Sequence, residues 1–189
     1  MSFQLVAGHP AVDLVNTLDW RFRAEGPEEL LKSYDDLLRF CQESGVLTTK
    51  RARRAADPRV LKRCIQLREA IAGILYPRLE GRDPSTRALK TLERYVKAAS
   101  IEQQLSWKHG RLEWDWNERD AELPLWALSM NASDLLLSDA VERVRACDNP
   151  KCRWLFLDTS KNHTRRWCDM SICGNRMKAR RFKAQRKGQ

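Results

Sequence analysis

The sequence lacks any long apolar run. No stretch approaches the roughly 18 apolar residues of a membrane-spanning helix. The short apolar segment 3–7 also has no basic residue before it, as a secretory signal would have. We therefore expect a cytoplasmic protein without a membrane partner. Because cytoplasmic thiols stay reduced, its six cysteines are expected to bind metal or to be buried, and not to form disulfides.

Histidine is scarce, and acidic residues are rare toward the C-terminal end. His9, His109 and His163 are scattered, and no nucleophile is spaced with a general base as a catalytic site would need. We therefore expect no enzyme activity. From residue 147 onward there are twelve lysines and arginines but only three acidic residues, all aspartates. The last 43 residues therefore hold nearly all of the net charge of +10. Such a local excess is typical of proteins that bind phosphate groups.

Four cysteines at the start of this basic region have the spacing of a zinc site. They form two close pairs, Cys147-x4-Cys152 and Cys168-x4-Cys173, separated by a hairpin-length spacer. Two such pairs supply the tetrahedral shell of one structural Zn²⁺, and four thiolates leave no open position for catalysis. His163 is an alternative ligand, but it lies in the middle of the spacer, outside either pair.

The spacer and the second pair predict a small treble-clef-like finger. We expect a strand over Trp154–Asp158, a loop over 159–164 and a return strand over Arg165–Cys168. Ser171 can cap a helix that carries Cys173 in its first turn. Because so polar a segment cannot build a sufficient core alone, metal binding must supply its folding free energy.

Two further groups of side chains have alternative interpretations. Trp154, Phe156 and Trp167 either stack on bases or form an apolar shell around the metal, and we expect the shell. Cys41 and Cys64 lie on apolar helical faces, so we expect them in the core and not on a metal.

The first 146 residues predict a multihelical domain with one small antiparallel β-hairpin. The chain would therefore be mainly α, with a helical domain over 1–146 and the finger over 147–189. Residues 51–56 predict a short basic helix. Start signals mark the other helices at Pro10, Ser33 with Asp36, Asp57-Pro58, Asp83-Pro84 and Pro124.

The sequence also predicts two details of this domain. The last helix should continue to Val144 with a kink near Ser138, and Leu137 should face inward. The hairpin shows apolar residues alternating with polar ones on both sides of the turn signal His109-Gly110. Its alternating apolar residues are Leu105, Trp107, Leu112, Trp114 and Trp116.

Four polar residues near the first helix, Asp13, Asn16, Arg21 and Arg23, are candidates for binding a small-molecule effector. They either line a ligand pocket or cap and pair within the fold, and we favour the second interpretation. The helical domain can also mediate homo-oligomer formation, which would suit a regulator that binds paired half-sites.

The basic residues of the last segment are candidates for nucleic-acid binding. A helix after Cys173 would present positive charge on nearly all sides and can lie along a groove, while cations of the loop and return strand grip the flanking backbone. The charge pattern suits DNA and RNA equally. The candidates are Lys161, Arg165, Arg166, Arg176, Lys178, Arg180, Arg181, Lys183 and Arg186.

These motifs resemble a known family. Cys173-Gly174-Asn175-Arg176 is the signature of the CGNR zinc finger family, and segments 154–158 and 165–170 are also similar to it. The segment His9–Thr17 resembles the opening of the ABATE domain, which precedes this finger in the family. The resemblance implies a stress-induced transcription regulator whose four cysteines bind zinc and whose finger binds DNA.

The leading hypothesis is therefore a zinc-dependent, DNA-binding transcriptional regulator with a helical domain that senses a ligand or mediates assembly. One alternative is a protein-interaction adaptor whose finger docks on an acidic partner. The other is a nucleic-acid-binding protein without sequence specificity.

Overall fold

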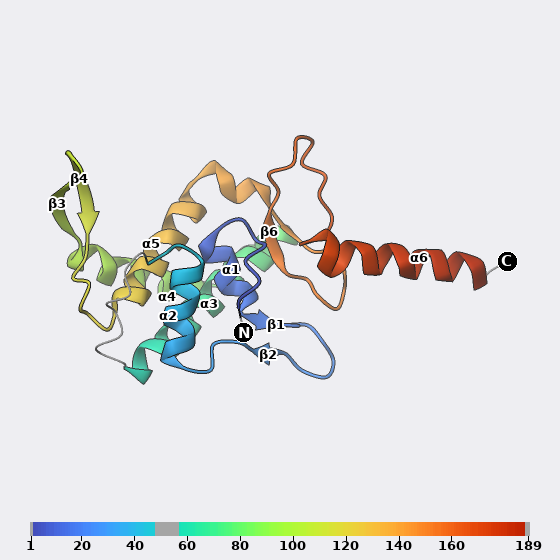
Figure 1. Cartoon of the computed structure of the whole chain (residues 1–189), viewed down its shortest axis with the longest axis horizontal. Coiled ribbons are helices and arrows are strands. Elements are labelled where there is room, and N and C mark those ends of the chain that lie inside the picture. Colours follow the sequence, from blue (N-terminus) through green and yellow to red (C-terminus); the bar gives the residue numbers. More distant parts are fainter. Residues whose placement is uncertain (1, 48–56, 188–189) are drawn as a thin grey trace.

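The computed structural model describes residues 2–47 and 57–187, which form a mainly helical body with a finger at one end (Figure 1). None of the described helices is long and apolar enough to cross a membrane. The α-helices are α1 (Pro10–Asn16), α2 (Tyr34–Glu43), α3 (Pro58–Leu79), α4 (Thr86–Glu102), α5 (Leu123–Leu137) and α6 (Asn175–Lys187). The strands are β1 (Leu18–Asp19), β2 (Glu28–Glu29), β3 (Gln104–Lys108), β4 (Arg111–Asp115), β5 (Val144–Ala146) and β6 (Leu155–Leu157).

Most of the predicted helix starts are confirmed. Pro10 lies in the first turn of α1, the Ser33 hydroxyl accepts a hydrogen bond from Asp36 N (3.1 Å), and Asp57 accepts one from Arg59 N (2.8 Å). The start of α4 was predicted wrongly. Its cap is Ser85, whose hydroxyl accepts from Ala88 N, because an N-cap must lie directly before the first helical residue. The basic helix predicted over 51–56 lies outside the described residues.

Helix α5 is the centre of the body and contacts α1, α2, α3 and α4. It is apolar on nearly every side, as expected for a helix surrounded by others. The prediction that it continues to Val144 is wrong. Ser138 adopts an extended conformation and starts the 3-10 turn η2 (Asp139–Arg143), which leads into β5. Leu137, expected to face inward, is 86% exposed at this break.

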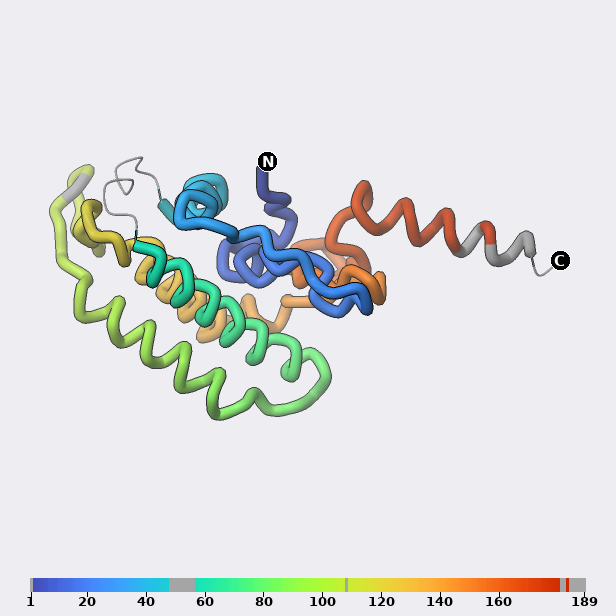
Figure 2. Tube along the Cα trace, turned by 90° about the horizontal axis from the view of Figure 1, so that it is seen from below, coloured from blue at the N-terminus to red at the C-terminus, as the bar shows by residue number. Residues whose placement is uncertain are grey.

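The β3–β4 hairpin is confirmed, with His109 and Gly110 at its turn. Their φ angles of +51° and +79° are those of a two-residue turn that favours glycine. Leu105 pairs with Trp114 and Trp107 with Leu112, and all four side chains are exposed. In both views the hairpin end of the body lies opposite α6 (Figures 1 and 2).

The finger shares a sheet and a core with the body. Strand β5 pairs with β6 in antiparallel register, and Val144, Leu155 and Leu157 belong to the main hydrophobic core. The buried Asn16 amide binds both backbone groups of Leu155, donating to its oxygen and accepting from its nitrogen, each at 2.9 Å. The division of the chain at residue 147 stays a prediction, but the described contacts fix the orientation of the finger on α1.

Replacing Asn16 by alanine should destabilise the protein by about 2–4 kcal/mol, because the Leu155 N–H and C=O would then be buried without partners. Urea unfolding of the zinc-loaded protein measures the change. Asn131→Ala is a matched control that removes one amide hydrogen bond within α5 and should cost less than about 1 kcal/mol. Equal losses in the two variants would contradict the proposed role of Asn16.

Candidate metal centre and nucleic-acid interface

The first cysteine pair is held by the tight turn between β5 and β6. Cys147 follows β5 directly, and its N–H donates to Trp154 O at 2.8 Å. Cys152 N donates to Asn149 O at 2.9 Å and closes the turn. These backbone hydrogen bonds hold the turn between the two strands in the shape that brings both thiols into one cluster.

The second pair belongs to the start of the C-terminal helix. Asp169 is the N-cap, and its carboxylate accepts from Ser171 N (2.6 Å) and Ile172 N (3.2 Å). It opens a π-helical turn, η3 (Met170–Gly174), which carries Cys173 and continues into α6. The prediction that Ser171 is the cap is thus corrected. Asp169 lies directly before the first helical residue, Met170, and its carboxylate reaches the free N–H groups of the first turn, whereas Ser171 is already inside that turn.

The return strand expected over Arg165–Cys168 is absent from the finger as described. This segment is irregular and makes one backbone hydrogen bond to the turn over residues 147–152, called the knuckle: Asp148 N donates to Arg166 O (2.9 Å). The place beside β6 is taken by β5, which lies before the first cysteine. The turn that carries the first cysteine pair therefore lies inside the β5–β6 hairpin, whose first strand belongs to the body, and the helix with the second pair follows.

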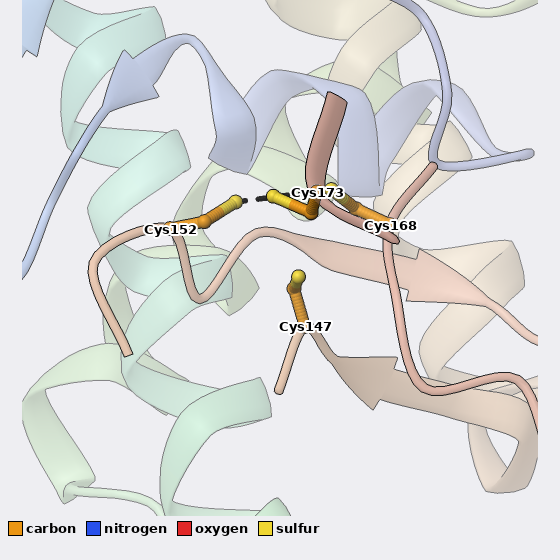
Figure 3. Close-up of side chains that lie close together, drawn as sticks. All are labelled: Cys147, Cys152, Cys168 and Cys173. Carbon is orange, nitrogen blue, oxygen red and sulfur yellow. Dashed lines mark hydrogen bonds between the residues drawn. The ribbon is translucent and has the colours of Figure 1, made fainter. Parts of the chain in front are cut away.

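The four thiols lie close together, as the ligands of one metal ion must (Figure 3). Their sulfur atoms are within 4.8 Å of one another, and all four residues are buried. Cys152 Sγ and Cys168 Sγ are 3.8 Å apart. Zn–S bonds of about 2.3 Å at tetrahedral angles place sulfurs about 3.8 Å apart, so the set fits one zinc ion.

The close approach of the thiols also shifts their pKa values in opposite directions. The thiols of Cys152 and Cys168 hydrogen-bond to Cys147, which lowers the pKa of Cys147 far below its usual value. The same hydrogen bonds, together with burial, raise the pKa of Cys152 and of Cys168. Without metal the cluster thus favours one thiolate, whereas Zn²⁺ needs and stabilises four.

Apolar side chains close the site off from solvent. Trp154 and Phe156 are buried with the cysteines, and Trp167 packs against them, which confirms the predicted shell. His163 is exposed in the loop with Nδ1 3.1 Å from Asp158 O, and it is not part of the thiol cluster. Cys41 and Cys64 are fully buried in the main core, as predicted, and burial raises the pKa of each.

The cations predicted around the loop have different surroundings. The Arg165 guanidinium lies 4.5 Å from the Phe156 ring centroid and donates to backbone oxygens of Trp167 and Cys168, so it is used to hold the finger. Arg166 is half exposed and pairs with Asp148 at 2.5 Å. Lys161 is exposed.

Helix α6 presents the other predicted cations. In both views it projects away from the body (Figures 1 and 2). Arg176, Lys178, Arg180 and Lys183 are exposed. Arg181 and Arg186 lie within the backbone of α6, and their side chains are outside the described part of the structure.

A basic cleft of about 380 Å³ lies between α6 and the knuckle. Arg176, Arg180 and Lys183 line one side of it, and Lys151 and Trp20 line the rest together with Asn149 and apolar atoms of α6. Lys151 was not among the candidates from the sequence. Its position between Pro150 and Cys152, on the turn that carries two ligands, is the signal that would have found it.

Two of the four candidate ligand residues of the body border a larger cavity of about 520 Å³. Asp13 accepts a hydrogen bond from Ala7 N (3.0 Å), and burial raises the pKa of Asp13 to about 6. Asn16 lines the same cavity beside it. Arg21 and Arg23 are not on its wall and form ion pairs instead, with Glu69 at 2.5 Å and Glu25 at 3.1 Å.

Comparison with known proteins identifies the two parts of the chain. Residues 143–186 match the CGNR zinc finger, and the four clustered thiols form the zinc site of that finger. Curated proteins gave no match. Residues 8–139 match ABATE, which is described as "Putative stress-induced transcription regulator". Since that match covers more than half of the chain, the protein belongs to the ABATE family, here joined to a CGNR zinc finger.

Proposed function

We propose that the protein is a zinc-dependent, DNA-binding transcriptional regulator, in which the finger and α6 contact DNA. The observation that carries this proposal is the geometry of α6. The helix starts two residues after the ligand Cys173 and extends outward with its described cations in solvent. A helix about 10–12 Å wide matches the width of the major groove, about 12 Å.

The zinc ion has a structural role in this proposal. Four thiols supply all the ligands of a tetrahedral ion, so no position remains for a reacting group. The ion instead holds the first turn of α6 against the knuckle. Arg176, in this turn, is the cation of α6 nearest to the metal ligands, so we assign the base contact to it, and the cleft that it lines with Arg180 and Lys183 is suited to a phosphate.

The helical body has the regulatory role in this proposal, either by sensing a ligand or by mediating assembly. Support comes from the cavity at its contact with the finger, which includes residues of both parts. An occupant of this cavity would touch the finger directly. No long linker separates the sensor from the DNA-binding element, since β5 and β6 form one sheet.

Selection of genomic DNA fragments by the full-length, zinc-loaded protein tests the proposal. We expect a small set of enriched sequences, bound at about 0.15 M salt. Enrichment of no sequence above random fragments, with DNA still retained, would favour the non-specific alternative. Loss of both DNA and heparin at this salt would favour the adaptor, because a protein that contacts several phosphates should keep appreciable affinity there.

A further inference from the structure

The cavity between body and finger is lined by residues of both parts. Its walls come from the N-terminal segment, α1, the β1–β2 pair and α2 on one side, and from the knuckle and η3 on the other. Its volume of about 520 Å³ is within the range of small-molecule sites. The cavity therefore has room for a ligand, and the charges on its walls indicate which kind.

Carboxylates of differing burial line the cavity, among them Asp13, Asp19 and Glu28. Asp13 is buried and Asp19 is half-buried, and Asp19 pairs in register with Glu28 across β1 and β2. Burial raises the pKa of Asp19, and the charge of Glu28 raises it further. The charged form of Asp19 is thus disfavoured, and a bound cation would stabilise it.

The cations on the cavity wall are less suited than the carboxylates to bind a charged ligand group. Lys32 and Arg176 are exposed, so water and salt screen them. Arg39 already pairs with Asp36 at 2.6 Å. Arg23, whose charge acts on Asp19, is paired with Glu25.

Aromatic rings complete the site. Trp20, Phe40 and Trp154 line the cavity together with the carboxylates. Trp154 is 7% exposed, and its indole N–H completes no hydrogen bond with the described residues, although it is close enough to lower the pKa of Asp19. Rings beside carboxylates are the surroundings in which proteins hold organic ammonium groups.

We propose that this cavity binds a small organic cation, with a protonated amine at Asp19 and Glu28 and a flat apolar body against Trp20 and Trp154. The proposal rests on the proposed sensing role of the body and names the chemistry of the effector. Trp154 and Arg176 of the finger also line the cavity, so the ligand would contact the DNA-binding element itself.

Isothermal titration of the full-length, zinc-loaded protein tests this assignment. The probes are 2-(2-naphthyl)ethylammonium and phenethylammonium, each compared with the carboxylate of the same length. We expect both amines to bind, and both carboxylates to bind at least about tenfold more weakly, because a buried acid repels them. No binding of either amine, or equal binding of amine and carboxylate, would overturn the proposal.

Variants locate the site. Asp19→Asn should weaken amine binding by about tenfold to a hundredfold, the loss expected for one charge-assisted hydrogen bond. Glu28→Gln, at an exposed position, should act in the same direction without disturbing the fold. The control Asp35→Asn removes an exposed carboxylate of α2 that is not on the cavity wall and should leave binding unchanged. Unchanged binding in both Asp19→Asn and Glu28→Gln would contradict the assignment.

DNA binding of the same preparations separates this inference from the proposed function. Probe binding is measured without DNA, so a protein that binds DNA but no amine contradicts the cation site alone. A protein that binds the amines but no DNA contradicts the DNA-binding proposal and leaves the site intact.

Discussion

Replacing Cys173 by serine is expected to abolish zinc retention and to unfold the finger. The thiol is one of four ligands within 4.8 Å of one another, and a hydroxyl is a much weaker zinc ligand. Structural zinc contributes about 10–16 kcal/mol to the folding of comparable modules, which is as large as the whole stability of a typical domain. Metal analysis after dialysis against metal-free buffer should give one zinc per chain for the parent protein and almost none for the variant.

The control for this experiment is Cys64→Ala. It also removes one thiol, but this thiol lies in the main core and is not part of the metal cluster. It should keep its zinc and lose only the stability expected for a small core cavity, about 1–2 kcal/mol. Zinc retained by Cys173→Ser would contradict the assignment of the ligands.

The loss should extend beyond the finger. Leu155 and Leu157 belong to the main core, and Leu157 N donates to Ala7 O at 2.7 Å. We therefore expect chelation to lower the unfolding temperature of the body as well, in one transition. Far-UV circular dichroism and tryptophan fluorescence should report the same midpoint.

The second large effect is expected from α6. Replacing Lys178, Arg180 and Lys183 together by alanine should weaken DNA binding by at least about tenfold at 0.15 M salt and reduce the salt slope by up to about 3. These three cations are exposed on the helix that projects from the metal centre. Alanine preserves the helix, so a change reports lost charge and not lost structure. Fluorescence anisotropy with labelled DNA at several salt concentrations measures both quantities.

A matched variant removes the same charge elsewhere. Lys62→Ala, Arg87→Ala and Lys90→Ala together remove three exposed cations of α3 and α4, on the body and away from α6. This variant should keep the parent salt slope to within about 1. If both triple variants lose the same affinity, net charge and not α6 determines binding, and the proposed interface is wrong.

Local signals predicted the metal centre and most element starts. The spacing of the four cysteines specified their cluster, because two short turns suffice to bring each pair together. His109-Gly110 specified the hairpin, since few other residues accept the left-handed conformation of its turn. Ser33, Asp57 and Pro10 marked helix starts through hydrogen bonds within three residues of the chain.

The positions of the caps Ser85 and Asp169 and the end of α5 were missed by a few residues, and the larger failures involve partners outside the local segment. The neighbour of β6 is β5, and no pattern within 154–168 indicates this choice over a return strand. The double hydrogen bond of Asn16 to Leu155 joins residues far apart in the chain, so its role was open between ligand binding and structure. Arg165 was predicted at an interface because its charge is visible in the sequence, whereas its Phe156 contact is tertiary.

The shared β5–β6 ladder bears on any attempt to transplant the zinc finger into another protein. A fragment excised at Cys147 would lack Val144–Ala146, leaving β6 with an open edge and the Leu155 side chain bare to water. A recipient scaffold would have to provide an equivalent strand and an amide like that of Asn16. The module is portable only together with the face of α1 on which it rests.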